Sequence, residues 1–489
     1  MSSPNVNTNI NTRVPGIYIS ENTSNAITGL VPVLDKVCII AQKTASGIAT
    51  DGTAVQILSV ADAILQCGAG SIGHIAVQAA INANPNITSG LSVLPLTDAS
   101  GSVDATGLMG FTTATAAGQV NTWIGDYNIQ YNYSSGDTSV AIAAGVGQAI
   151  KNQTGNIPIV CDTSAAASVH LVAVNAGTIG NSIAISCTAS GGTGVIPTVT
   201  PMAGGLGDPT IGPYTSAGKA LANIAGAGYT IIASTFSDST RLAHIKGLID
   251  FVSGPQEEKP CTAYYAYTDL IGSVAAAEAL ALTLNDGRIV GAYQSYSTGQ
   301  LAKTPAFAIA SAYAAIIASQ TDPAAPYDGY DLPGVATQAV PDRMTQSALE
   351  ALLENGVAPL KVAPGEIETI CRAITTYTVN SLGYPDPTLL DITTFRSLDY
   401  TRFQIISRLS NMLKGAKNSA RMRKNIKAAI LNVLYELEAL EIVQNVNQYK
   451  NSIIVESDLT NLGQVNVSIP ANIVYGLHTV VGFINLILS

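Results

Sequence analysis

The chain has 489 residues, of which 47% are hydrophobic and only 11% are charged, and it carries a formal net charge of −10. Its length allows more than one hydrophobic core, so we expect about two to four domains. Its uninterrupted apolar runs are shorter than the ~18 to 20 residues of a membrane helix, and polar residues break the most apolar stretch, 473–488. A long chain with few charges and no membrane segment is expected to bury much of its surface against other chains, which favours an assembly.

The first 22 residues are expected to form an extended arm. The opening MSSPNVNTNINTR has neither the basic start nor the apolar run of a signal peptide. In the segment NTRVPGIYISEN, at 11–22, the β-branched and aromatic residues favour strand geometry, and no neighbouring segment offers a hairpin partner. The sequence therefore predicts a strand that needs a partner from elsewhere.

Residues 23–96 are predicted to form the first segment of a core domain. A buried strand is expected at 37–41, followed over 60–84 by a helix, a glycine break and a second helix. Gly68, Gly70 and Gly73 spell G-x-G-x-x-G, which in a dinucleotide site follows a strand and precedes an acidic residue by about 20 positions. Here a helical pattern precedes the glycines and no acid lies between Gly73 and Thr97. A glycine turn between two packed helices is the preferred interpretation.

Residues 97–209 are predicted to form an inserted, mostly β outer domain. Gly, Thr, Ser and Asn dominate this stretch, and short alternating runs appear at 127–133 (YNIQYNY) and 182–188 (SIAISCT). Turn-rich spacing of this kind is typical of β domains. The run 140–151 is expected to be its one helix.

Residues 210–395 are predicted to form an α/β second segment of the core. Expected helices at 217–225, 239–253 and 273–285 precede expected strands at 229–234, 261–267 and 289–293, an alternation typical of a parallel sheet. A further helix at 305–320 is apolar nearly all round and hence expected to be buried. The run GPYTSAGK, at 212–219, lacks the spacing, the hydroxyl and the preceding strand of a phosphate-binding loop.

Residues 396–463 are predicted to form the C-terminal helical part of the core, with helices at 399–414 and 425–443. Between Arg396 and Lys427 the chain carries nine Lys or Arg residues and one acid, Asp399, whereas the rest of the chain is strongly acidic. A basic stripe on an acidic protein is expected to dock something negative, and the acidic remainder would repel DNA. An acidic protein surface is the preferred partner; a solvated face or nucleic acid are the alternatives. The candidate docking residues are Arg402, Arg408, Lys414, Lys417, Arg421, Arg423 and Lys424.

Residues 464–489 are predicted to form a C-terminal strand arm. The run QVNVSIP, at 464–470, alternates strictly, and 480–488 is apolar on both faces. Unpaired strands at both chain ends would be liabilities on a monomer, so we expect them to be donated to the sheets of neighbouring copies. The candidate residues for this exchange are Val14, Ile17, Tyr18, Ile19, Val465, Val467, Ile469, Val481, Phe483, Ile484 and Leu486.

The residues that commonly carry catalysis or bind metals form no recognisable set. The six cysteines lie far apart, without a C-x-x-C pair or a His at ligand spacing, which argues against a zinc site or a disulfide framework. His244 with Asp250 offers an acid–base pair, but solvated helix faces explain both residues more simply. We therefore expect no enzymatic activity and no cofactor.

Short motifs along the chain together resemble the tail sheath proteins of contractile phages, in particular their Mu-like branch. The resemblance covers nearly the whole chain except the predicted β insertion. The motifs are RVPGIY at 13–18, the glycine–serine turn at 67–73, LPGV at 332–335, EALLENG at 350–356, RAITTY at 372–377 and DYTR at 399–402.

This resemblance implies a mixed α/β multidomain fold with terminal arms and an outward-projecting insertion. It implies a structural subunit of a virion tail, assembled in the bacterial cytoplasm, that stacks as hexameric rings in a helical array around an inner tube. The implied partners are further copies of the chain, the inner tail tube protein, and the baseplate and tail terminator proteins, with no direct nucleic acid contact and no membrane insertion. Contraction would drive the tube through a cell envelope with energy stored at assembly. A nucleotide-binding enzyme using Gly68–Gly73, or another virion structural protein, is the alternative.

Overall fold

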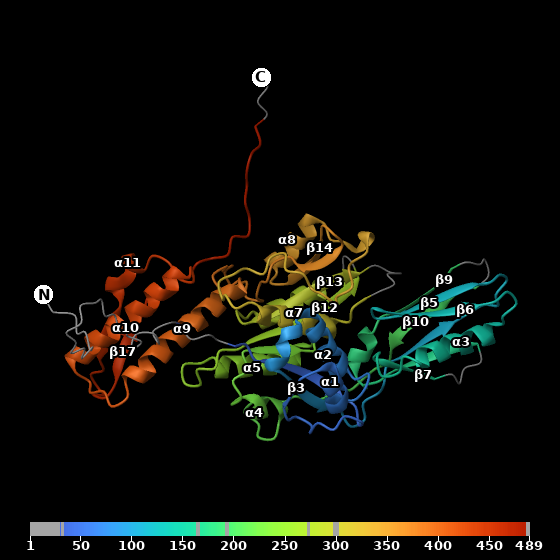
Figure 1. Ribbon diagram of the computed structural model, residues 1–489, viewed down its shortest axis with the longest axis horizontal. Helices are drawn as coiled ribbons and strands as arrows, with labels where there is room; N and C mark the ends of the chain where they lie inside the picture. The colour runs from blue at the N-terminus through green and yellow to red at the C-terminus, as the bar shows by residue number, and fades with distance from the viewer. Residues whose placement is uncertain are drawn as a thin grey trace, which may run out of the picture. The chain divides into compact units, whose positions relative to one another are not determined.

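A computed structural model of the protein describes residues 30, 34–162, 167–190, 195–270, 274–296 and 303–485 (Figure 1). The chain divides into two compact units. Residues 400–472 belong to one unit, and residues 34–399 and 473–485 belong to the other.

The larger unit is built on an eight-stranded sheet in the order β15-β14-β13-β12-β11-β1-β3-β2. Strands β3, β1, β11, β12, β13 and β14 pair in parallel, while β2 and β15 are antiparallel at the two edges. The predicted mixed α/β fold with parallel strands is therefore confirmed. The strands are β1 Val37–Lys43, β2 Val55–Gln56, β3 Leu91–Thr97, β11 Ile231–Ser234, β12 Thr262–Leu270, β13 Ile289–Tyr296, β14 Ala358–Ala363 and β15 Ile367–Ile370.

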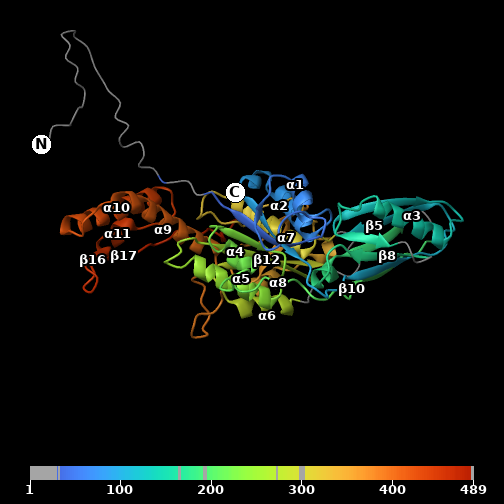
Figure 2. The same cartoon turned by 90° about the horizontal axis from the view of Figure 1, so that it is seen from below.

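Helices cover both faces of this sheet (Figure 2). One face carries α1 Val60–Cys67, α2 Ile72–Ala83 and α7 Ala306–Ser319, and the other carries α4 Ala220–Ile224, α5 Ser239–Val252, α6 Ala275–Leu284 and α8 Gln346–Glu354. Every residue of α7 from Phe307 to Ile317 is buried, as its uniformly apolar sequence predicts. Short 3-10 helices complete the unit at η1 Pro85–Ser89, η2 Thr178–Ser182 and η3 Val340–Asp342.

Residues 105–203 form two further sheets around a separate hydrophobic core. One sheet has the order β10-β4-β8-β7 and the other has the order β6-β5-β9. Helix α3 Ser139–Lys151 packs against strands of both sheets. The strands are β4 Thr106–Gly110, β5 Gly118–Ile124, β6 Tyr127–Tyr133, β7 Ile159–Asp162, β8 Ser168–Ala173, β9 Ile185–Ser190 and β10 Thr198–Ala203.

An aspartate holds each of the two crossings between this β region and the large sheet. Asp98, directly after β3, accepts hydrogen bonds from Gln42 Nε2 at 2.7 Å, from Asn175 Nδ2 at 3.0 Å and from the Ala176 amide at 3.0 Å. At the return crossing, Asp208 accepts from the amide and the hydroxyl of Thr178.

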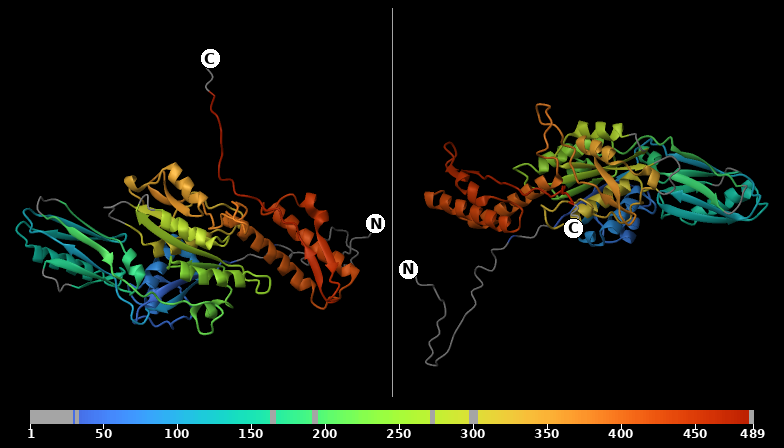
Figure 3. Two further views of the ribbon diagram at one scale, coloured as in Figure 1. Left: turned by 180° about the vertical axis from the view of Figure 1, so that it is seen from behind. Right: turned by 90° about the horizontal axis from the view of Figure 1, so that it is seen from above.

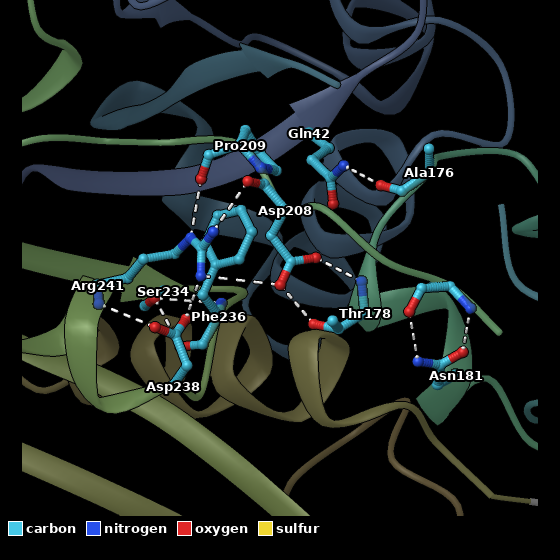
Figure 4. A network of polar contacts seen from close by, with 11 residues as sticks. Gln42, Ala176, Thr178, Asn181, Asp208, Pro209, Ser234, Phe236, Asp238 and Arg241 are labelled. Carbon is cyan, nitrogen blue, oxygen red and sulfur yellow. Dashed lines mark hydrogen bonds and ion pairs between the residues drawn. The ribbon is translucent and has the colours of Figure 1, made fainter. Parts of the chain in front are cut away.

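Arg241 of α5 clamps the return crossing to the large sheet (Figure 4). Its guanidinium donates to the carbonyl of Pro209 at 2.8 Å and to the carbonyl of Asp208 at 3.0 Å. It also pairs with the carboxylate of Asp238, the residue that caps α5, at 2.9 Å. Both crossings are thus fixed by charged groups rather than by the turns alone.

Residues 400–472, the part of the smaller unit described above, are helical with one hairpin. Helix α9 Ile392–Met412 enters it, and α10 Ala420–Ala439, α11 Val446–Tyr449 and η4 Lys450–Ser452 follow. Strands β16 Ile454–Ser457 and β17 Val465–Ser468 pair antiparallel and pack against α10. The buried residues of α10 lie on one side of the helix, so this stripe forms the core of the unit; they are Ile426, Ile430, Val433, Leu434 and Leu437.

Candidate assembly surfaces

The predicted docking cations divide into two groups in the structure. Arg408 lies on α9, half-buried, and its Nη2 donates to both carboxylate oxygens of Glu436 on α10, at 2.9 and 3.0 Å. Arg402 also lies half-buried on α9. The Arg408–Glu436 pair joins α9 to α10, which the sequence did not reveal because Glu436 is 28 positions from Arg408. The docking role of both arginines stays a prediction.

The remaining five cations gather around the turn between α9 and α10. Lys414 and Lys417 lie in the turn, and Arg421, Arg423 and Lys424 lie in the first turns of α10. All but Arg423 are exposed; Arg423 donates to Asn418 Oδ1 at 2.8 Å. We call these five residues the basic turn.

The basic turn occupies the unfavourable end of a helix. The N-terminus of a helix carries a partial positive charge, so a cation there costs about 0.3 to 1 kcal/mol. Helix α10 has no acidic residue in its first turn, where acids are normally favoured. The chain therefore places repelling charges where they do not help the fold, which favours a role with an external partner.

The β16–β17 hairpin is a two-stranded sheet. Asp458 closes its loop by accepting hydrogen bonds from the hydroxyl of Thr460, the amides of Asn461 and Thr460, and Asn466 Nδ2. These bonds, the one from the Thr460 hydroxyl above all, hold the pKa of the Asp458 carboxyl far below its usual value. Neither outer edge of the hairpin pairs with another strand in the part of the chain that the structure describes. Two strands alone are marginally stable, and open edges accept further strands.

The predicted exchange residues Val465 and Val467 lie on β17 of this hairpin. They pair with Ser457 and Val455 of the same chain, and Ile469 follows directly after the strand. Strand β16 thus occupies one edge of β17 within the subunit. A strand from a neighbouring copy could join only the opposite edge of β17 or the outer edge of β16. Their exchange between copies stays a prediction.

The C-terminal arm leaves the larger unit as a single extended segment, drawn in red in Figure 3. His478 anchors its start: the Nδ1 atom lies 2.6 Å from Asp328 Oδ2, and the Nε2 atom lies 3.5 Å from Asp391 Oδ1. This anchor was not predictable from local sequence patterns, because Asp328 is 150 positions from His478.

Residues 479–485, which follow His478, are exposed. Val481, Phe483 and Ile484 are 84%, 93% and 102% exposed, and residues 480–485 form no strand. A strand needs a second strand for its backbone hydrogen bonds, and residues 480–485 have none among the described residues of this chain. This explains why the predicted strand is absent from a single chain. Of the other candidates, Val14, Ile17, Tyr18, Ile19 and Leu486 lie outside the described residues.

The glycine motif is a turn between helices, as expected. Helix α1 precedes Gly68, and Ser71 caps α2 by accepting from the His74 amide. A Cβ atom on Gly68 would lie 1.9 Å from Thr44 Oγ1, so protein atoms fill the space beside this glycine. The strand that a pyrophosphate site needs before the motif is replaced by a helix.

Neither a candidate metal site nor a membrane-spanning helix is present among the described residues. These residues contain no group of three or more His, Cys, Asp or Glu side chains arranged to hold a metal ion. None of their helices is both long enough and apolar enough to span a membrane.

The family model and the related protein that match this chain are both of tail sheath proteins. Residues 384–487 match the family model of the phage tail sheath C-terminal domain. The chain is 28% identical over 480 residues to the Mu-like prophage FluMu tail sheath protein of Haemophilus influenzae, covering 94% of this chain and 95% of that protein.

Solved structures share the fold at low sequence identity. A chain in the cryo-EM structure of the anti-feeding prophage baseplate in its contracted state is 12% identical, with a TM-score of 0.51, over 97% of this chain and 99% of that one. The crystal structure of a sheath tail protein from Listeria innocua is also 12% identical, with a TM-score of 0.50, over 92% of this chain and 95% of that one.

Proposed function

We propose that this chain, a homologue of the tail sheath proteins along almost its whole length, is the structural subunit of a contractile tail sheath. The observation that carries the proposal is the relationship to a Mu-like tail sheath protein over 94% of the chain. The subunit assembles with copies of itself as stacked hexameric rings in a helical array. The array surrounds an inner tube in a virion tail.

Neighbouring copies are joined by strand exchange. The exposed arm at 480–485 supplies a strand, and the open edges of the β16–β17 hairpin offer places to receive one. Burying a Val, Ile or Phe side chain contributes about 1.5 to 3 kcal/mol, so covering Val481, Phe483 and Ile484 contributes about 5 to 9 kcal/mol per link. The N-terminal residues Val14 and Ile17 are a second donor on sequence pattern alone.

The basic turn contacts the inner tube. Its exposed cations suit an acidic protein surface, and exposed ion pairs are individually weak, about 0 to 1 kcal/mol each. A contact made of several weak pairs holds the extended array in register and is released pair by pair during contraction. Arg402 and Arg408 on α9 extend this proposed contact, and Arg408 also pairs with Glu436 of α10.

Contraction uses energy stored at assembly, so the subunit needs no cofactor and no catalytic step. The baseplate triggers the change, the terminator caps the array, and the shortening sheath drives the tube through the host envelope. A different role as another virion structural protein is the second candidate, because an exposed apolar arm can link copies in more than one kind of assembly.

The test is electron microscopy of the overexpressed chain. We expect hollow tubes from the full chain. Truncation of residues 480–489 should abolish the tubes and leave a folded monomer, because the arm's exposed apolar side chains contribute nothing to the described core. Circular dichroism and gel filtration measure folding and association.

A point-mutant pair sharpens this test. The triple variant Val481→Ser, Phe483→Ser, Ile484→Ser should also lose the tubes. The matched control is the pair Ile48→Ser and Leu58→Ser, which removes side chains that are 64% and 65% exposed elsewhere on the larger unit. Normal tubes from the arm variants would contradict strand exchange, whereas globular shells from the full chain would favour the capsid alternative.

A further inference from the structure

The outer face of the sheet β6-β5-β9 has an unusual composition. The register aligns Gln130 with Asn121 and Thr188 across the three strands, and it aligns Asn128 with Trp123 and Ser186. The next row adds Gln119 and Asn132, whose amides hydrogen-bond at 3.0 Å, which confirms that these side chains share one face. We call this face the amide face.

The opposite face of the same sheet is the buried one. Val120, Ile124 and Ile129 belong to the core of the β region, and Tyr131 packs directly on α3. A Cβ atom on Gly145 of α3 would lie only 2.1 Å from the Tyr131 ring. The amide face therefore points away from the core, and Asn128, Gln130 and Asn132 are exposed.

Strands β5, β6 and β9 contain no Asp, Glu, Lys, Arg or His. Solvent-facing strands usually carry charges, which keep a sheet soluble and unpaired. An anionic ligand would require Lys or Arg, and a helix or apolar partner would require an apolar face. Neither requirement is met, so an occupant of this face must be uncharged and polar.

The side chains that are present suit a polyhydroxyl ligand. Each Asn or Gln amide offers two donors and an acceptor oxygen, which matches sugar hydroxyls that also donate and accept. Trp123 is half-buried in the same face, beside Asn128 and Ser186, and is the single tryptophan of the chain. An indole ring among polar groups provides the flat apolar surface on which the C–H face of a pyranose ring stacks.

We infer that the amide face binds an uncharged glycan, with Trp123 stacking on a sugar ring and Asn121 and Gln130 hydrogen-bonding its hydroxyls. This binding site is independent of the proposed sheath assembly and stands on the face alone. Its affinity rests on one aromatic ring and a few amides, so we expect a Kd of about 1 mM for a short saccharide.

The test uses the full chain and soluble uncharged polysaccharides: dextran, galactomannan and hydroxyethyl cellulose. Trp123 is the sole tryptophan, so its fluorescence reports on the amide face alone. We expect at least one polymer to change the tryptophan emission and to retard the protein in affinity electrophoresis. Dextran sulfate serves as the charged counterpart of dextran.

The variants Trp123→Ala and Asn121→Ala should each weaken retardation by about tenfold. The matched control is Gln148→Ala, which removes an exposed amide from α3 on the other side of the sheet. Asn121→Ala keeps the fluorophore and decides the result if Trp123→Ala fails to fold. Electron microscopy of the same variants should show unchanged tubes, which separates this inference from the sheath proposal.

Three results would overturn the inference. They are no response to any of the uncharged polymers, equal weakening by Gln148→Ala and Asn121→Ala, and stronger binding of dextran sulfate than of all three uncharged polymers.

Discussion

Replacing Glu368 by Gln should remove a pH-dependent loss of stability. Glu368 lies on β15, is 1% exposed, and accepts hydrogen bonds from the amide of Gln338 at 3.1 Å and from its Nε2 at 3.2 Å. Burial raises the pKa of the Glu368 carboxyl from 4.5 to about 7, and the hydrogen bonds from Gln338 and Gln294 and the charge of Arg343 oppose this rise. The folded protein therefore holds this proton more tightly than the unfolded chain does.

The sign and size of the effect follow from this pKa difference. Below pH 4.5 both states are protonated and the folded state has its full stability. As the pH rises toward about 7, the unfolded chain releases the proton first, so the free energy of unfolding falls. A shift of about 2.5 units corresponds to about 3 kcal/mol, of which about 2 kcal/mol is lost between about pH 5.5 and about pH 7.5.

The Glu368→Gln variant keeps the shape of the side chain and stays neutral at every pH. One donor of Gln338 then faces an amide NH₂ group, which costs about 1 kcal/mol. Urea unfolding followed by circular dichroism at both pH values should show the variant losing about 2 kcal/mol less than the wild type. Glu350→Gln, at an exposed position on α8, is the control. Parallel pH profiles for wild type and Glu368→Gln would refute the reasoning.

Three further predictions concern assembly and the two units. The variant Arg241→Met should lower the free energy of unfolding by about 2 to 3 kcal/mol, whereas the control Lys219→Met should change it little. Equal urea midpoints for the two variants would contradict the clamp. His478→Ala should raise the rate of proteolysis within 473–485 at least about tenfold without lowering the melting temperature, as mass spectrometry of the fragments would show; an unchanged rate argues against the anchor. Charge reversal of the exposed basic turn changes four residues to Glu: Lys414, Lys417, Arg421 and Lys424. It should reduce co-sedimentation of the chain with tail tubes, more so at low salt, and leave sheath tubes intact. Undiminished binding would assign the tube contact to another surface.

Local patterns were sufficient to predict the layered fold. Helical spacing over 60–84 and the glycines at its centre predicted α1, the turn and α2, which pack against each other and against the same sheet. The alternation from 229 to 293 predicted parallel strands, since consecutive strands of one direction need a crossover helix. The uniform apolarity of α7 predicted its burial on the sheet.

Long-range pairings were not predictable in the same way. The basic stripe looked continuous in sequence, which did not show that Arg408 pairs with Glu436 on the neighbouring helix. Strict alternation correctly predicted a strand at 465–468, but not that β16 of the same chain is its partner. Periodicity shows that a segment has two faces, whereas the partner of each face depends on the tertiary fold and on other copies.

The amide face escaped sequence reasoning for a related reason. Its residues come from three strands between 118 and 190, and each run alone reads as an ordinary alternating strand. Only the register shows that the polar positions of all three coincide around Trp123.

The two aspartates at the crossings of the β region have a consequence for how this chain can vary. Hydrogen bonds fix the two points at which the chain leaves and rejoins the large sheet. Asp98 accepts them from Gln42, Asn175 and Ala176, and Asp208 accepts them from Thr178. The β region between these two points can change in length or sequence while both crossings are kept, because its hydrophobic core is separate from the core of the large sheet. A related chain could therefore carry a different inserted domain on the same eight-stranded sheet.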